Sequence, residues 1–295
     1  MNIQWFPGHM AKTRRLLAEN LKLVDVVIEL LDARIPASSK NPEIDAITGS
    51  KPRITALNKA DLADEAVSKE WMKWYSSRGN TVIFIDSVKG TGISQLKSGL
   101  RAIMKERLER DREKGRIFRP IRTMVAGIPN VGKSSFINKI TGRAGAVTGD
   151  KPGVTRGKQW IRVNEEIELL DTPGILWPKF DDENIAQNLA FTGAIKDEIL
   201  DTVELAAALM GRLAGTYPEK LSQRFRLPSL EGRTGLELLE TAGKNRGCII
   251  SGGETDLQRI SAIVLDEFRG GKIGRITLEK PVWGEVTGNE KQRER

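Results

Sequence analysis

The 295-residue chain has one cysteine, one histidine and no apolar run long enough to cross a bilayer. Because a single cysteine, Cys248, cannot form an internal disulfide, a reducing, cytoplasmic setting is expected rather than secretion. The first ten residues lack the basic and apolar regions of a secretory signal. These absences predict a soluble, unprocessed protein without a membrane partner.

Positive charge is in modest excess overall but is concentrated in one stretch. Lysine and arginine number 47 against 39 aspartates and glutamates, which gives a formal charge of +8. Between Arg116 and Val163, ten basic residues accompany one acid, Asp150, so that segment alone carries +9. One nucleoside triphosphate needs only one or two of these cations, so the surplus predicts a polyanion nearby. Ordinary surface lysines and arginines are the alternative.

Residues 127–134, Gly-Ile-Pro-Asn-Val-Gly-Lys-Ser, match the phosphate-binding loop G-x-x-x-x-G-K-[ST]. An apolar strand is predicted before the loop and a helix after it, so backbone N–H groups and a helix N-terminus would face an anion. Lys133 is expected to reach the β- and γ-phosphates and the Ser134 hydroxyl to bind Mg²⁺. A chance Gly-rich turn is the alternative. The predicted phosphate-binding residues are Asn130, Val131, Gly132, Lys133, Ser134 and Ser135.

The segment Asn58–Asp61 has the pattern N-K-x-D and follows an apolar strand. The Asp61 carboxylate can accept hydrogen bonds from N1–H and N2–H₂ of guanine, whereas adenine offers an acceptor at N1 and would leave the carboxylate unpaired. The site is therefore expected to prefer GTP to ATP, unless Asp61 merely caps the next helix. The residues predicted to contact the base are Asn58, Lys59, Ala60 and Asp61, with Asp86, Ser87 and Val88 after the next strand, where a backbone N–H would meet guanine O6.

Two later segments supply the expected switches. Thr155 lies in a Gly/Pro loop and would meet Mg²⁺ and the γ-phosphate. In Asp171-Thr172-Pro173-Gly174, the aspartate would hold Mg²⁺ and the Gly174 N–H would sense the γ-phosphate. The predicted magnesium ligands are Ser134, Thr155 and Asp171.

Apolar runs alternate with helical periodicity, which predicts a mostly parallel sheet with helices on both faces. A mainly helical pattern follows from about residue 182, ending in a predicted strand at Arg275–Leu278. The predicted strands are 24–31, 53–57, 81–85, 121–126, 158–163 and 167–170, and the predicted helices of this half include 11–22, 42–47, 65–77 and 93–112.

In the usual guanine-nucleotide fold the phosphate loop precedes N-K-x-D, but here the order is reversed. Over residues 1–180 this order resembles the circularly permuted GTPases. The motifs Trp5–Met10, Asp32–Pro36, 127–134 and 171–178 resemble, over the full length, the bacterial ribosome biogenesis GTPase A family. The resemblance implies a cytoplasmic protein that binds the large (50S) ribosomal subunit and its rRNA late in assembly and hydrolyses GTP when it meets that subunit.

Three segments are expected on this basis: a circularly permuted P-loop GTPase domain at 1–180, a helical domain at 181–282, and a disordered tail at 283–295. The family's counterpart of the helical domain binds RNA. Charge alone does not predict RNA binding there, because acids and bases nearly balance from Asp197 onward. The protein is expected to be a monomer off the ribosome.

The residue after Gly174 is Ile175, so no glutamine stands there to orient the attacking water and intrinsic hydrolysis should be slow. The resemblance suggests His9 as a catalytic residue; a lone histidine on the surface is the alternative. It also suggests that Asn130 helps to hold a potassium ion. Arg34 is expected either to act as an arginine finger or to form a structural ion pair.

Two other functions stay open. One is a GTP-gated RNA-binding module whose hydrolysis is incidental, and the other is an ATP-using enzyme, against which Asp61 argues.

Overall fold

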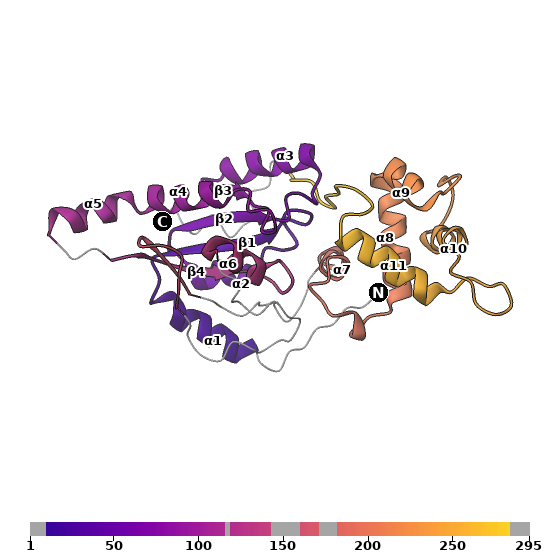
Figure 1. The fold of residues 1–295 in the computed structure, drawn as a ribbon, viewed down its shortest axis with the longest axis horizontal. Coiled ribbons are helices and arrows are strands. Elements are labelled where there is room, and N and C mark those ends of the chain that lie inside the picture. Colours follow the sequence, from indigo (N-terminus) through magenta and orange to yellow (C-terminus); the bar gives the residue numbers. More distant parts are fainter. Residues whose placement is uncertain (1–9, 116–118, 143–159, 171–181, 284–295) are drawn as a thin grey trace.

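The computed structural model describes residues 10–115, 119–142, 160–170 and 182–283, with the backbone alone described for residues 10–14. Its first half is built on a six-stranded sheet in the order β3-β2-β1-β4-β6-β5 (Figure 1). Neighbouring strands are parallel except β5, which runs antiparallel to β6. The strands are β1 Val26–Asp32, β2 Arg53–Asn58, β3 Thr81–Phe84, β4 Ile121–Ala126, β5 Trp160–Arg162 and β6 Ile167–Leu170.

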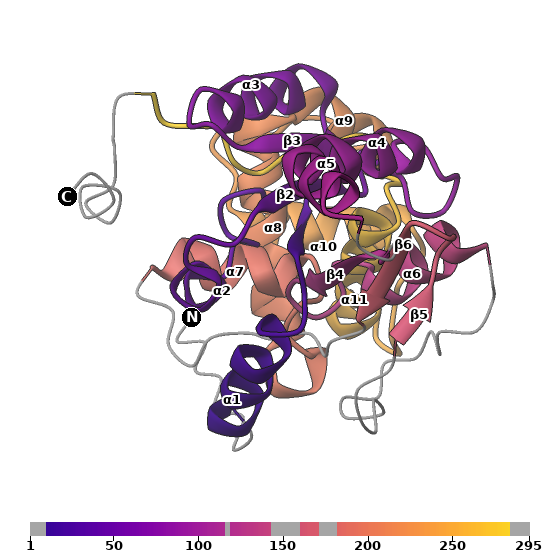
Figure 2. The ribbon, with the colours of Figure 1, turned by 90° about the vertical axis from the view of Figure 1, so that its left-hand side faces the viewer.

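Helices cover both faces of this sheet (Figure 2). All seven residues of β1 are buried, as expected for a parallel strand covered on both sides. Val27 and Leu31 face α1, α2 and α3, while Ile28 and Leu30 face α4 and α6. The helices are α1 Met10–Leu21, α2 Pro42–Thr48, α3 Glu65–Ser76, α4 Ile93–Ile103, α5 Lys105–Glu113 and α6 Lys133–Thr141.

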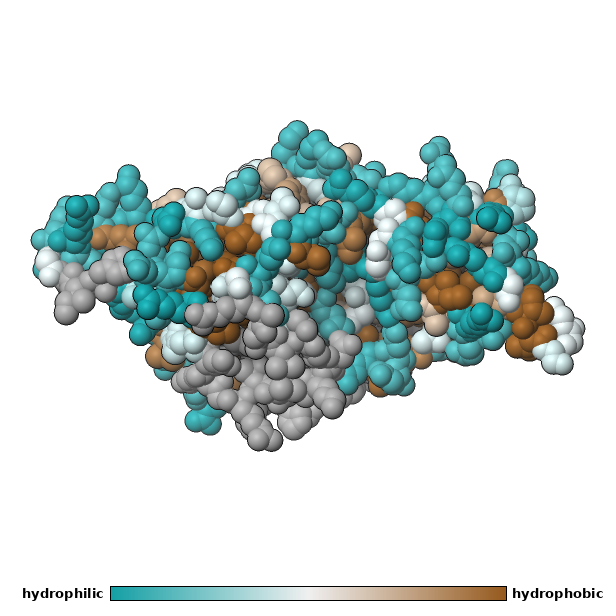
Figure 3. Space-filling model, viewed as in Figure 1, coloured by the Kyte–Doolittle hydropathy of each residue, from teal (hydrophilic) through white to brown (hydrophobic). Residues whose placement is uncertain are grey.

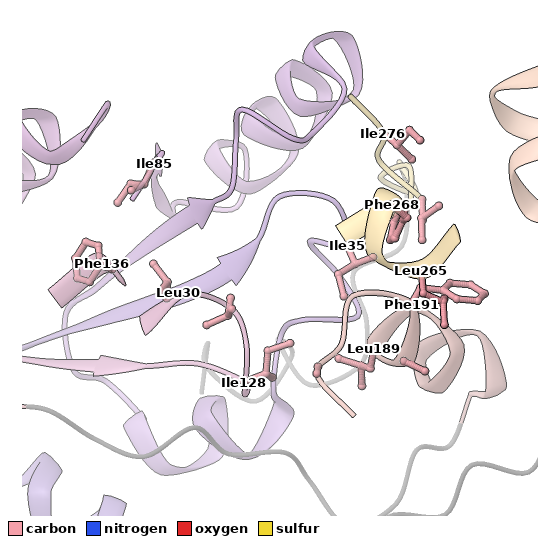
Figure 4. Packing of buried hydrophobic residues seen from close by; sticks show 14 of the residues in the cluster. Leu30, Ile35, Ile85, Ile128, Phe136, Leu189, Phe191, Leu265, Phe268 and Ile276 are labelled. Carbon is pink, nitrogen blue, oxygen red and sulfur yellow. The ribbon is translucent and has the colours of Figure 1, made fainter. Parts of the chain in front are cut away.

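Residues 182–283 form a mainly helical part beside the sheet (Figure 1). Its core is continuous with that of the sheet. Figure 4 shows Ile35 and Ile128, from loops at the sheet edge, facing Leu189 of α7 and Leu265 and Phe268 of α11. The elements are α7 Glu183–Phe191, the 3₁₀ turn Asp197–Ile199, α8 Thr202–Thr216, α9 Pro218–Phe225, α10 Gly235–Asn245 and α11 Leu257–Arg269.

The surface seen in Figure 3 is mostly hydrophilic. Within the described ranges, no helix is both long enough and apolar enough to cross a membrane.

The predicted strand at Arg275–Leu278 is wrong. Its backbone joins no sheet; instead the Ile276 N–H donates to Leu62 O at 2.9 Å and the Leu278 N–H to Arg34 O at 2.8 Å. The alternation of Ile276 and Leu278 reflects burial against two loops of the sheet half, where no strand lies beside them. The predicted helix 93–112 is also divided, since α4 ends and α5 begins on either side of Met104.

Candidate nucleotide-binding site

The predicted nucleotide residues gather where the strand order changes direction. From β1 the sheet continues to β2 on one side and to β4 on the other. Loops that follow such neighbouring strands leave a crevice at the carboxyl edge of the sheet, where ligands bind in open α/β folds. Asp32 ends β1 beside Asn58 of β2, and the phosphate loop begins after Ala126 of β4.

Both glycines of the phosphate loop are required by close contacts. A Cβ on Gly127 would lie 2.6 Å from Leu30 O. Gly132 has a φ of 96°, and its Cβ would lie 2.5 Å from Nδ2 of Asn58. No other residue type fits these positions without displacing backbone or the Asn58 side chain.

Helix α6 begins at Lys133 without a side-chain cap, so the first N–H groups of the helix are available to an anion. The Lys133 ammonium lies over the loop and donates to Gly127 O at 3.1 Å and Ile128 O at 2.8 Å. Ser134 follows and is half-buried. This arrangement can bind phosphate oxygens and place one hydroxyl ligand for Mg²⁺.

Asn58 joins the base-reading loop to the phosphate loop. Its Nδ2 donates to Val131 O at 2.8 Å, and its Oδ1 accepts from Ser87 Oγ at 2.6 Å and from Ser87 N at 3.2 Å. The structure thus brings together three segments that the sequence analysis assigned to one nucleotide. The alternative of a chance Gly-rich turn does not account for these bonds.

Asp61 is exposed, and within the described part of the chain its carboxylate accepts no hydrogen bond. It is therefore free to accept from a base. In the neighbouring loop, which was predicted to offer a backbone N–H to guanine O6, the N–H groups have partners within the protein: Ser87 N donates to Asn58 Oδ1 at 3.2 Å and Val88 N to Asp86 Oδ1 at 2.9 Å. Lys89 N donates to the same oxygen at 2.9 Å. Asp86 is buried, and its carboxylate holds the backbone of this loop through these two hydrogen bonds.

Lys59, predicted to contact the base, also binds the phosphate loop. Its ammonium donates to Asn130 O at 2.7 Å and lies 3.1 Å from Asp32 Oδ2. Burial lowers the pKa of Lys59 and Asp32 opposes that effect. Burial alone would raise the pKa of Asp32, but the charges of Arg34 and Lys59 hold it well below its usual range.

Arg34 forms the structural ion pair rather than a finger. Its side chain is 1% exposed; Nε and Nη2 donate to Asp32 at 2.9 and 2.7 Å. Nη1 donates to Arg269 O at 3.2 Å at the end of α11. The sequence analysis named Asp32 only as part of the Asp32–Pro36 motif and did not predict that it pairs with Arg34 and Lys59, although a carboxylate at the end of a buried strand was a usable signal.

His9, Thr155, Asp171 and Gly174 lie outside the described residues, as does the tail after Trp283. Only Ser134 of the predicted magnesium set is therefore placed. Among the described side chains, no group of three or more His, Cys, Asp or Glu is positioned to hold a metal ion.

Part of the predicted basic surplus is paired. Arg119 donates to Asp25 at 2.8 Å, and Arg122 lies 3.6 Å from Glu168. Both acids lie outside the segment from Arg116 to Val163, so the count of +9 overstated the charge available to a polyanion.

Comparison with known proteins decides the family. The profile of a family described as "50S ribosome-binding GTPase" matches residues 122–221, which include the phosphate loop and leave Asn58–Asp61 outside. Ribosome biogenesis GTPase A of Bacillus cereus is 48% identical over 281 residues, 95% of each chain. The chain belongs to the ribosome biogenesis GTPase A family. The Thermotoga maritima protein of that name is 30% identical over 282 residues, again 95% of each chain.

Solved structures agree with the ribosome biogenesis GTPase A assignment. GNP-bound YlqF from T. maritima superimposes with a TM-score of 0.64 at 27% identity, covering 92% of this chain and 98% of that chain. GDP-bound YlqF gives the same TM-score at 26% identity, covering 90% and 99%. The permuted P-loop GTPase fold is thereby confirmed. The chain is a GTPase, and GTPases of this kind generally use Mg²⁺.

Proposed function

We propose that this protein binds the large (50S) ribosomal subunit during late maturation and hydrolyses GTP under stimulation by that subunit. The observation that carries the proposal is the Asn58 bridge between the guanine-reading and phosphate loops, in a chain similar along its length to ribosome biogenesis GTPase A proteins. The protein acts in the cytoplasm, as a monomer off the ribosome. Its helical part contacts rRNA.

The chain's own residues divide the work of binding. Asp61 accepts from the guanine edge, and Asn58 holds the base-reading and phosphate loops in register. The α6 N-terminus, Lys133 and Ser134 bind the phosphates and Mg²⁺. Thr155 and Asp171 complete the magnesium ligands, and Gly174 senses the γ-phosphate. Magnesium supplies neutralisation of the phosphate charge.

Stimulation by the subunit is needed because Ile175 leaves no water-orienting glutamine. We assign that role to His9 and transition-state charge stabilisation to a potassium ion near Asn130. Asn130 has a φ of 55°, and its Nδ2 donates to Gly193 O at 2.6 Å, so its Oδ1 is the atom that would meet the ion.

The test is phosphate release from GTP by the full chain, alone and with purified 50S or 30S subunits, in potassium and in sodium. We expect 50S subunits, but not 30S subunits, to stimulate GTP hydrolysis, and we expect a lower rate in sodium than in potassium. Lys133→Ala should abolish hydrolysis. His9→Ala should keep nucleotide affinity while lowering turnover, because a group that acts only in the transition state leaves ground-state binding unchanged. Stimulation by neither subunit would reject the ribosomal role, and RNA binding with negligible hydrolysis in every mixture would favour the GTP-gated RNA module.

A further inference from the structure

Several cations of the helical part cluster around one cavity, although this part of the chain has no net positive charge. Residues 182–283 contain 13 lysines and arginines and 15 aspartates and glutamates, a net charge of −2. Five of those cations line a single open cavity of about 570 Å³ between α9, the end of α10 and the turn after α11. They are Lys220, Arg224, Arg226, Arg246 and Lys272.

Three of the five cations have internal partners. Arg224 and Arg246 both bind the buried carboxylate of Glu267, at 2.5 and 3.2 Å. Burial alone would raise the pKa of Glu267, but these guanidinium groups hold it below its usual value, so the acid stays charged. Lys220 donates to Arg275 O and lies 3.6 Å from Asp64.

The other two cations point to a ligand. Arg226 and Lys272 are exposed, and neither side chain donates a hydrogen bond or forms an ion pair within the part of the chain that the structure describes. Lys272 acts on Glu267 only through its charge, which helps to lower the pKa of that acid. Arg226 also has a φ of 54° just after α9, a position that favours glycine.

Helix ends alone do not account for the cluster. The C-termini of α9, α10 and α11 converge here, and each carries roughly half a negative charge. Together with Glu267, and with Asp64 beside Lys220, they amount to roughly −3.5 against five cations. A positive excess remains at the cavity mouth, and it attracts an anion from solvent.

We propose that this cavity binds a backbone phosphate of RNA. The inference deepens the proposed function, on which the choice of RNA rests. Arg226 offers a planar fork that matches phosphate oxygens, and Lys272 offers a mobile point charge beside it. The cavity is several times larger than a phosphate ion, and Gln223 in its wall adds an amide for a ribose hydroxyl or base edge. A chain with a ribose and a base on each side of the phosphate fits such a site.

The experiment measures binding of a fluorescent single-stranded RNA of mixed sequence to the full chain saturated with GDP, across a salt series. Arg226→Gly and Lys272→Ala should each weaken binding about tenfold at low salt, as expected for loss of a charged hydrogen bond. Each should also reduce the salt slope by about one. Arg259→Ala is the matched control, because Arg259 is exposed at the opposite end of α11, and it should change affinity less than twofold.

Arg226→Gly keeps the result interpretable, since a φ of 54° suits glycine and the variant should melt no lower than the parent. Unchanged RNA affinity in both variants would overturn the proposal. Displacement of RNA by inorganic phosphate at an equal concentration of phosphate groups would identify a small-anion site and overturn it too. Stimulation of GTP hydrolysis by 50S subunits is measured in parallel. If the cavity variants weaken RNA binding but 50S does not stimulate the wild type, the proposed function is rejected and the cavity site stands. If 50S stimulates the wild type but the variants bind RNA normally, the cavity site is rejected and the proposed function stands.

Discussion

We propose that base choice depends on Asp61, whose exposed carboxylate is bound to nothing in the described structure. Asp61→Asn should weaken GTP binding about hundredfold, because two hydrogen bonds to a charged acceptor are lost or reversed. Binding of xanthosine triphosphate should improve, since the amide can donate to O2 of xanthine. Competition binding with both nucleotides measures the shift. Glu70→Gln, an exposed acid on α3, is the control, and a mutant that still prefers GTP strongly would refute the guanine site.

Asp32 stabilises the fold through its buried ion pair with Arg34. Asp32→Asn should lower the free energy of unfolding by about 3 kcal/mol or more, because it leaves Arg34 buried and without a counter-charge. Denaturant unfolding measures this loss. Glu19→Gln breaks the exposed pair with Arg15 and should cost under about 1 kcal/mol. Equal losses in the two variants would show that the Asp32 network is not the anchor that its burial suggests.

At this scale the sequence predicts the chemistry of groups better than their partners. The pattern N-K-x-D predicted that Asn58 lies beside the phosphate loop, and Asn58 does bond to Val131 O there. It did not predict that Lys59 binds Asp32 and Asn130 O, because those contacts join segments 27 and 71 residues apart. Such pairings form only when the chain is packed, so a local sequence pattern cannot predict them.

The phosphate loop is the element with the tightest steric requirement. Gly132→Ala would place a Cβ 2.5 Å from Asn58 Nδ2 and force the amide away from Val131 O. Lost bonding and left-handed backbone strain together should weaken nucleotide affinity by roughly 2 kcal/mol, on the order of 30-fold. Titration with a fluorescent GDP measures it.

Gly142→Ala is a matched control for that prediction. Gly142 ends the same helix with a φ of 67° but has nothing within 4 Å of its Cβ. This variant carries the strain without the clash, so its nucleotide affinity should stay near that of wild type. Equal losses of affinity in the two variants would assign the effect to backbone strain rather than to Asn58.

Elements with strong local signals were predicted well, and the others were not. β1 is a run of apolar residues with two acids, Glu29 and Asp32, and the apolar run located the strand from the sequence. Helix α9 was missed because its buried face consists of only Leu221 and Phe225 among charged neighbours. Alternation at Ile276 and Leu278 shows that one face is buried, but it cannot show that the covering surface is a pair of loops.

The whole molecule has its two halves joined by a continuous core. Figure 4 shows Ile35 and Ile128 covered by residues of α7 and α11. The last turn of α11 also receives the Arg34 guanidinium. Removal of the helical part would expose apolar side chains and take the carbonyl acceptors at the end of α11 from Arg34, so point variants are the proper tests of communication between the halves.

The helical part contacts each nucleotide-reading loop through separate bonds. Asn130 Nδ2 of the phosphate loop donates to Gly193 O after α7, at 2.6 Å. Arg275 donates to Ala60 O and Ala63 O of the base-reading loop at 3.1 and 2.7 Å. A ligand on the helical part can therefore act on the phosphate side or on the base side, and the two routes have different consequences.

Only the phosphate-side contact distinguishes GTP from GDP, because the two nucleotides share the base. Under the proposed function, the large subunit should bind more tightly with a non-hydrolysable GTP analogue than with GDP, and by linkage it should tighten the analogue equally. Asn130→Ala should reduce that ratio toward one. Arg275→Ala should weaken both nucleotides alike and keep the ratio. Co-sedimentation with 50S subunits in each nucleotide state measures the ratio. Equal sedimentation of the wild type in both states would reject the coupling between nucleotide and subunit. An unchanged ratio in Asn130→Ala would show that this coupling does not pass through the bond from Asn130 to Gly193.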